Sequence, residues 1–207
     1  MDRKNSFYVL YPKNNRLKNF LNSIKLLCDY NQRTEAHITV RGPYKNKIGE
    51  DFVTKWSNII SGEILHISFV ENFFPFGQNT VFFRCEDNNA LRKVWNKLTY
   101  NDFKPHITMY DGKNKRFAIK LYNLIASDFE PFLYEVDKLS YLEPKNPTLL
   151  DMFSLKNNFD YSFYKEILDI DIDLEILKKI SEETRLLYIK SILRHLKAEF
   201  NTYNYKS

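Results

Sequence analysis

Two segments of the sequence repeat a histidine and a threonine at the same spacing. His37 and Thr39 are separated by one isoleucine, and so are His106 and Thr108. In a β-strand, residues i and i+2 project to the same face, so each histidine shares a face with its threonine while the isoleucine faces the core. Imidazole, with an ordinary pKa of about 6.5, gains and loses protons near neutral pH. Two such side chains can divide general-base and general-acid work between them.

The elements that must position these residues can be predicted from apolar periodicity and turn residues. We expect strands over 6–12, 36–43, 64–74, 80–85, 104–110 and 133–142, and helices over 15–30, 51–60, 89–98 and 117–126. This order, β-α-β-α-β-β-α-β-α-β, favours an α+β sandwich over a doubly wound parallel sheet. Each half contains a helix followed by a strand with His-Ile-Thr, which suggests two related lobes.

The character of the chain changes after Pro147. Residues 148–207 are rich in Leu, Ile and acidic residues and contain no Gly or Pro. From Leu174 onward the apolar spacing predicts amphipathic helix, broken near Ser181. We therefore divide the chain into a domain over 1–145 and a helical C-terminal extension over 146–207. The extension is expected to pack on the domain, or to mediate self-association or binding of a protein partner.

The two segments His37-Ile-Thr-Val-Arg-Gly-Pro-Tyr and Pro105-His-Ile-Thr-Met-Tyr resemble the paired His-x-[Ser/Thr]-x motifs of the 2H phosphoesterase superfamily. This superfamily includes the 2′-5′ RNA ligase-like proteins and cyclic nucleotide phosphodiesterases. The resemblance covers residues 5–143, and the tail has no counterpart in it. It implies a bilobal fold in which two antiparallel sheets form a central cleft with flanking helices.

The resemblance also implies an activity. His37 and His106 would face each other across a phosphate, with the hydroxyls of Thr39 and Thr108 bound to its non-bridging oxygens. We expect a phosphodiesterase that needs neither metal nor cofactor and hydrolyses a 2′,3′-cyclic phosphate or a phosphodiester of a small or cyclic (oligo)nucleotide. For the opening of a cyclic phosphate we favour His106 as base and His37 as acid, although the substrate's orientation decides this.

Five further residues are candidates for substrate binding. By strand alternation, Arg41 lies on the His37 side and is placed to contact phosphate. Lys104, two residues before His106, is a second candidate, with a solvated strand end as the alternative. Tyr44 and Tyr110 follow the two motifs and could stack on a base, or serve only in packing. Tyr8 is expected to line the cleft by family analogy alone.

Other functions remain open at this stage. RNA-end processing or 2′-5′ RNA ligase-like activity is supported by the basic amino end, where residues 1–50 carry ten Lys/Arg and four Asp/Glu. RNA ligase-like members often have an Arg soon after the second motif, whereas Met-Tyr-Asp stands here, which favours a small or cyclic nucleotide. A non-catalytic nucleotide-binding module that recruits a partner through its C-terminal helices is a further alternative. So is an inactive sandwich in which both histidines are ordinary strand residues.

Composition excludes several other classes. With only five glycines, the sequence contains no Gly-rich phosphate loop or dinucleotide fingerprint, and Cys28 and Cys85 are too few for a disulfide framework. There is no His-x-His-x-His segment and no closely spaced zinc-ligand cluster. His66 lacks a threonine two residues later and is expected to be structural, and His195 to lie on the surface or at an interface. No apolar run approaches a membrane span, and no secretory signal is evident, so we expect a cytoplasmic protein with no membrane contact.

Overall fold

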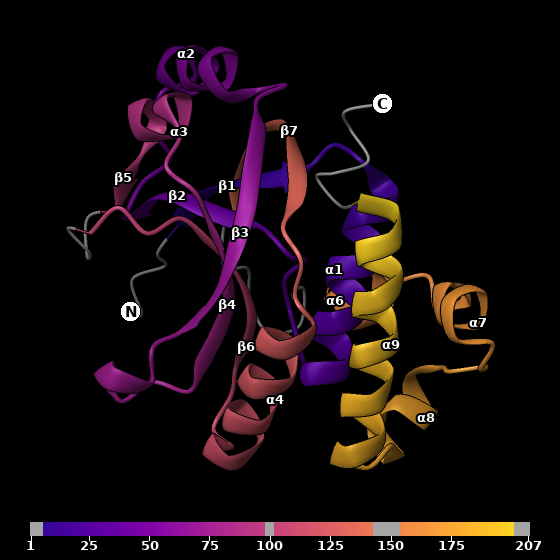
Figure 1. Ribbon diagram of the computed structural model, residues 1–207. Coiled ribbons are helices and arrows are strands. Elements are labelled where there is room, and N and C mark those ends of the chain that lie inside the picture. The colour runs from indigo at the N-terminus through magenta and orange to yellow at the C-terminus, as the bar shows by residue number, and fades with distance from the viewer. Residues whose placement is uncertain (1–5, 98–101, 143–153, 201–207) are drawn as a thin grey trace.

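The computed structural model describes residues 6–97, 102–142 and 154–200, and has an α+β fold (Figure 1). The strands are β1 (Ser6–Pro12), β2 (Ile38–Tyr44), β3 (Ile64–Asn72), β4 (Thr80–Cys85), β5 (Asn96–Lys97), β6 (His106–Asp111) and β7 (Phe132–Leu142). The helices are α1 (Asn15–Cys28), α2 (Glu50–Ile60), α3 (Asn89–Val94), α4 (Lys115–Asp128), α6 (Leu155–Asn158), α7 (Ser162–Leu168), α8 (Leu174–Lys179) and α9 (Glu182–Phe200), with a 3-10 turn η1 (Phe74–Phe76).

The described strands form one sheet in the order β1-β7-β3-β4-β6-β2-β5, and β1 also pairs with β2. Apart from the short parallel pair β2–β5, every pairing is antiparallel. The two halves of the chain have a similar strand topology. In the first half β1 pairs with β2, and in the second half β4 pairs with β6. The last strand of each half pairs with the other half. Strand β3, which ends the first half, pairs with β4, and β7, which ends the second half, pairs with β1. The result is two strand triplets, β7-β1-β2 and β3-β4-β6.

The two triplets meet twice. Strands β3 and β7 pair over four residues, from Ile64 to Ile67 on β3. Strands β2 and β6 are joined through a single residue pair, Ile38 with Ile107. Further along β2, Arg41 and Gly42 pair with β5 instead, so β2 does not continue alongside β6.

Helices α1 and α4 pack against the sheet, and α2 and α3 contact each other near its upper end in Figure 1. Helix α1 begins where the side-chain oxygen of Asn14 accepts hydrogen bonds from the backbone N–H groups of Arg16 and Leu17, at 2.8 and 3.1 Å. From Phe20 to Cys28 every residue of α1 is buried, including the polar Asn22 and Lys25. The helix is therefore covered on the side away from the sheet as well.

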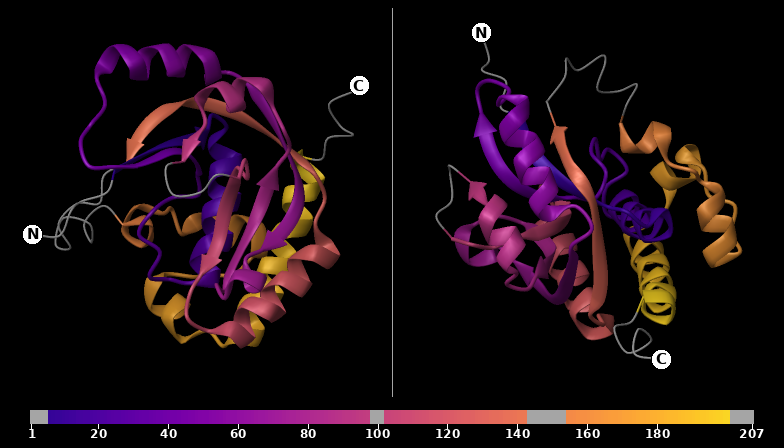
Figure 2. Two further views of the ribbon diagram at one scale, coloured as in Figure 1. Left: turned by 90° about the vertical axis from the view of Figure 1, so that its left-hand side faces the viewer. Right: turned by 90° about the horizontal axis from the view of Figure 1, so that it is seen from above.

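The C-terminal helices provide that cover. Helix α9 packs on α1 and α4, and α7 contacts both α1 and α9. Figures 1 and 2 show the resulting order of layers, with α1 between the sheet and the C-terminal helices. The hydroxyl of Tyr164 donates a 2.9 Å hydrogen bond to the buried Ser23 carbonyl, and the rings of Phe20 and Phe163 pack edge to face. The extension is thus a layer of the domain's own core.

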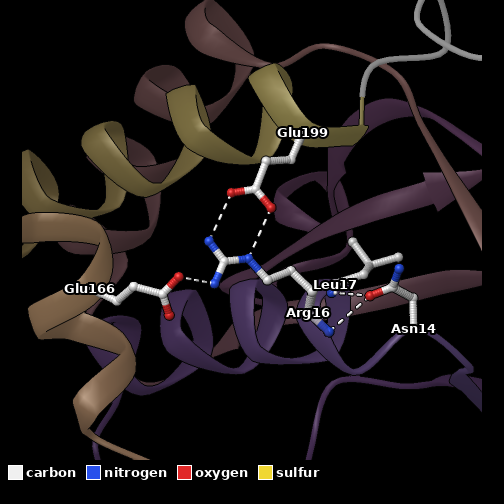
Figure 3. A network of polar contacts seen from close by, with 5 residues as sticks. All are labelled: Asn14, Arg16, Leu17, Glu166 and Glu199. Carbon is white, nitrogen blue, oxygen red and sulfur yellow. Dashed lines mark hydrogen bonds and ion pairs between the residues drawn. The ribbon is translucent and has the colours of Figure 1, made fainter.

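Arg16, in the first turn of α1, links three helices (Figure 3). Its Nε and one terminal nitrogen donate to the two carboxylate oxygens of Glu199 on α9, each at 2.9 Å. The other terminal nitrogen bonds Glu166 on α7. The guanidinium also lies over the rings of Phe20 and Phe163, 5.3 Å from each ring centroid. One side chain therefore fixes both α7 and α9 against α1.

The α+β class and the helical C-terminal part are confirmed, and the helix break near Ser181 falls between α8 and α9. The domain boundary at 145/146 lies outside the described residues. Strand β5 was not predicted; its two residues fall inside the helix expected over 89–98, which ends at Val94. His37 lies one residue before β2, whereas the sequence places it within the strand.

Candidate active site

The two histidines flank the point where β2 and β6 meet. Ile38 and Ile107 are paired there, and both are fully buried. His37 and His106 immediately precede them and are partly exposed. The neighbouring strands of the two triplets thus bring together segments far apart in the sequence, and the isoleucines face the core as the alternation predicts.

The register also places the threonines. Ile38 and Ile107 are paired, and each is flanked in sequence by a histidine and a threonine, His37 and Thr39 in the first segment and His106 and Thr108 in the second. Residues that flank a paired position on either strand project to the face opposite to that of the paired side chains. All four side chains are partly exposed, in contrast to the buried residues between them. The structure therefore gathers two imidazoles and two hydroxyls on one face.

Each imidazole is held in the same way. Nδ1 of His37 lies 2.7 Å from the carbonyl oxygen of Glu35, and Nδ1 of His106 lies 2.7 Å from that of Lys104. A bond to a carbonyl requires a proton on Nδ1, so in the neutral ring the lone pair is on Nε2. On the first segment, the side-chain oxygen of the buried Asn22 accepts a 2.7 Å hydrogen bond from the Ala36 backbone N–H. Helix α1 thereby fixes the backbone beside His37.

A bulge follows each threonine. Across β1 and β2, Val9 pairs with Thr39 but Tyr8 pairs with Arg41, so Val40 is the extra residue. Across β4 and β6, the pairs with Thr108 and Tyr110 likewise come from adjacent residues of β4. Adjacent residues of a strand face opposite ways. Arg41 and Tyr110, which pair with the residues adjacent to the partners of Thr39 and Thr108, therefore lie on the face opposite to the two threonines.

Arg41 is consequently not on the His37 side, as simple alternation predicts. It is buried, and one terminal nitrogen donates a 2.8 Å hydrogen bond to the Val94 carbonyl of α3. Its guanidinium lies 3.5 Å from the ring centroid of Trp56 on α2. The guanidinium of Arg41 therefore lies between α2, α3 and the sheet. A phosphate contact for Arg41 stays a prediction.

The tyrosine candidates lie on the same helix-covered side. Tyr8 is fully buried, accepts a hydrogen bond from the Ile48 backbone N–H at 3.0 Å, and packs against Tyr44 and Trp56. Tyr44 is partly exposed, and its buried hydroxyl has no hydrogen-bond partner among the described residues. These contacts are those of a packed aromatic cluster, and base stacking by Tyr44 stays a prediction.

Tyr110 is buried against Phe117 of α4, and its hydroxyl accepts a 3.1 Å hydrogen bond from the Asn114 backbone N–H. Burial raises the pKa of its hydroxyl. It lines a cavity of about 310 Å³ together with Cys28 of α1 and Arg185 of α9. Tyr110, like Arg41, is turned by its bulge away from the face of Thr108, so this cavity is separate from the histidine pair.

Lys104 lies beside His106 as expected, and its ammonium is paired. Its Nζ is 2.7 Å from one carboxylate oxygen of Glu71, and a terminal nitrogen of Arg84 donates to the other at 2.5 Å. Burial raises the pKa of Glu71, but the hydrogen bonds from Lys104 and Arg84 outweigh it and hold that pKa below its ordinary value. Arg84 is the cross-strand partner of His106, so the group lies next to the imidazole.

Aromatic side chains surround both histidines. The ring of Tyr11 is 5.9 Å from that of His37, and the rings of Phe82 and Phe73 are 4.6 and 5.5 Å from that of His106. Burial, and to a lesser degree the charge of Glu35, raises the pKa of Tyr11 to about 12, so its hydroxyl stays protonated.

Sequence reasoning missed several of these neighbours, namely Tyr11, Asn22, Glu71, Phe73, Phe82 and Arg84. Tyr11 could have been found from alternation within the strand over 6–12, and Asn22 as a polar residue inside an apolar helix. The others depend on strand pairing, for which the sequence carries no direct signal.

The remaining histidines lie elsewhere. His66 is exposed on β3 and His195 is exposed on α9, and both cysteines are free and buried. Burial raises the pKa of both thiols, that of Cys85 to about 12. Within the described ranges, no three His, Cys, Asp or Glu side chains are grouped so as to hold a metal ion.

No protein-family model matches the chain, and no curated protein matches it either. In the part of the chain that the structure describes, no helix combines the length and the apolar character needed to cross a membrane. The candidate site therefore rests on its own geometry.

Proposed function

We propose that the chain is a phosphoesterase of the 2H type, which cleaves a 2′,3′-cyclic phosphate or a phosphodiester of a small or cyclic (oligo)nucleotide. The triplets β7-β1-β2 and β3-β4-β6 would be its two lobes. The single observation that carries this proposal is the duplicated arrangement at the Ile38–Ile107 pair. Each half supplies a histidine with Nδ1 bonded to a carbonyl two residues earlier, a threonine on the same face and a bulge after that threonine.

The chemistry follows from the positions of the protons. One neutral imidazole takes a proton from water on its Nε2 as the water oxygen attacks phosphorus. The bond from phosphorus to the ribose oxygen breaks, and the other imidazole, protonated beforehand, donates its proton to that oxygen. The two threonine hydroxyls donate hydrogen bonds to the non-bridging oxygens, whose negative charge increases in the transition state. The products are a phosphomonoester and a ribose hydroxyl, and exchange with solvent restores both histidines.

The first test is hydrolysis, in the presence of EDTA, of 2′,3′-cyclic mononucleotides, 2′-5′ and 3′-5′ dinucleotides, and cyclic di- and trinucleotides. We expect turnover of at least one substrate that survives chelation and falls by a hundredfold or more, roughly the contribution of a general acid or base, in both His37→Ala and His106→Ala. Turnover of an added RNA oligonucleotide with a 2′,3′-cyclic phosphate end, and of none of these smaller substrates, would indicate RNA-end processing. Tight nucleotide binding without turnover would indicate a binding module and overturn the proposal.

A further inference from the structure

Three charged side chains form a compact group on the side of His106 that faces β4. Glu71 of β3 accepts hydrogen bonds from Arg84 of β4 and from Lys104, one on each carboxylate oxygen. All three side chains are partly exposed, at 26, 39 and 32%, and so can be reached by a ligand. The group carries one more positive than negative charge and lies on the same face as the imidazole.

The guanidinium of Arg84 is incompletely used. It bonds Glu71 through one terminal nitrogen, and the side chain is 39% exposed, so its outer N–H groups can be reached by a ligand. A guanidinium can bind an oxyanion through two parallel N–H groups, and a phosphate offers more acceptor oxygens than the single one used here. A phosphate that displaced the Glu71 carboxylate would accept hydrogen bonds from both Arg84 and Lys104.

The equivalent position beside His37 differs in charge. There, Lys18 pairs with Glu35 at 2.8 Å, so one cation faces one anion and no positive charge is left over. The ring of Tyr11 lies under Lys18 just as Phe73 and Phe82 lie under Lys104. Arg84 thus gives the group beside His106 a cation more than the Lys18–Glu35 pair beside His37 has.

We propose that Arg84 and Lys104 bind a second phosphate of the substrate, next to the phosphate held by the two histidines. Glu71 occupies this subsite when no ligand is bound. The inference rests on the proposed function and narrows its substrate class to oligonucleotides, in which an internal phosphodiester neighbours the reacting one. A cyclic mononucleotide would leave the subsite to Glu71.

The test compares two dinucleotides that end in a 2′,3′-cyclic phosphate and differ only in the internal linkage, a phosphodiester or an uncharged methylphosphonate. We expect wild type to have a KM about tenfold or more lower for the charged dinucleotide, as one charge-assisted hydrogen bond provides. Arg84→Gln and Lys104→Gln should each raise the KM for the charged dinucleotide more than that for the methylphosphonate, and so reduce or remove the preference. Arg84→Lys should restore only part of it, because lysine lacks the planar fork.

Glu71→Gln separates this role from a merely structural one. Without the competing carboxylate, the preference for the charged dinucleotide should increase, whereas a structural ion pair would lose stability and activity on both substrates alike. Lys120→Gln is the matched control, because Lys120 of α4 pairs with Glu183 of α9 and lies outside the site. Equal effects of the site variants on both dinucleotides would overturn the subsite.

Binding of the two corresponding uncleaved dinucleotides with a 3′-phosphate, followed by calorimetry, distinguishes the two proposals. A preference for the charged ligand that depends on Arg84, without turnover of any substrate, would retain the subsite and reject the phosphoesterase. Turnover without that preference would retain the phosphoesterase and reject the subsite.

Discussion

At the residue scale, the catalytic proposal depends on how the backbone beside each histidine is held. Asn22 is the clearest case, because its buried amide oxygen is the acceptor for the Ala36 N–H. In Asn22→Ala that N–H loses its partner, which we expect to cost about 1–3 kcal/mol and to lower kcat by displacing His37. Ser23→Ala is the control, since the buried Ser23 hydroxyl donates its hydrogen bond to the Phe20 carbonyl within the same helix. Equal kcat in the two variants would show that Asn22 does not position the histidine.

Lys25 gives a pH-dependent prediction. Burial is the main cause that lowers the pKa of this lysine from 10.5 to about 8, and its Nζ donates a 3.0 Å hydrogen bond to the Thr34 carbonyl. Below pH 8 the folded and unfolded chains are both protonated, and burial of the charge has its full cost. Between pH 8 and 10.5 the unfolded chain binds more protons, so the free energy of unfolding rises with pH.

Urea unfolding of wild type and Lys25→Met at pH 7 and pH 10 measures this effect. We expect the stability of wild type, relative to the variant, to increase by a few kcal/mol between the two pH values. A pH-independent difference would mean that the folded chain holds the Lys25 proton as tightly as the unfolded chain does, and would contradict the lowered pKa. Tyrosines common to both proteins cancel in the comparison.

The residues also show what could be predicted from the sequence and what could not. Strand alternation correctly predicted that Ile38 and Ile107 face the core, with the histidines and threonines on the other face. It failed at Arg41, because a bulge inserts one residue and reverses the alternation. Bulges depend on the pairing of two strands, which a single chain segment does not reveal.

At the element scale, the helices and strands of the first 142 residues were predicted well because their apolar periodicity is strong. The short strand β5 was missed, since two residues carry no periodicity. The burial of helix α1 could be predicted only in part. Its predicted apolar stripe is buried, but Asn22 and Lys25 are buried as well, because the C-terminal helices cover the opposite side. The sequence left open whether the extension packs on the domain or on a partner.

The contact between α1 and the extension can be tested at Arg16. Arg16→Met removes the paired hydrogen bonds to Glu199 and the bond to Glu166. Because Arg16 is one-third exposed, we expect a loss of about 1 kcal/mol, measured by urea unfolding, with faster amide exchange in α9. Arg92→Met, which removes a local exposed pair with Asp87, should change neither α9 exchange nor overall stability by as much. Identical exchange in both variants would contradict the role of Arg16.

At the scale of the whole molecule, the fold places three layers in order, namely the sheet, the helices α1 and α4, and the extension (Figure 2). The histidine pair lies on the sheet face away from its buried isoleucines, and the extension contributes to the core. Part of the extension's apolar surface remains exposed, at Ile176 and Leu187. Self-association or binding of a protein partner through these helices stays a prediction, which light scattering of wild type and Leu187→Glu would test.

The central claim is that His37 and His106 act together on one phosphate. The most direct measurement is kcat for the best cyclic-phosphate substrate in His37→Gln, His106→Gln and the double variant. Each single variant should lose a hundredfold or more, and the double variant should be little slower than the worse single one, because both groups serve one step. His66→Gln and His195→Gln should be unchanged. Near-normal kcat in either active-site variant, or losses that simply multiply, would contradict joint catalysis.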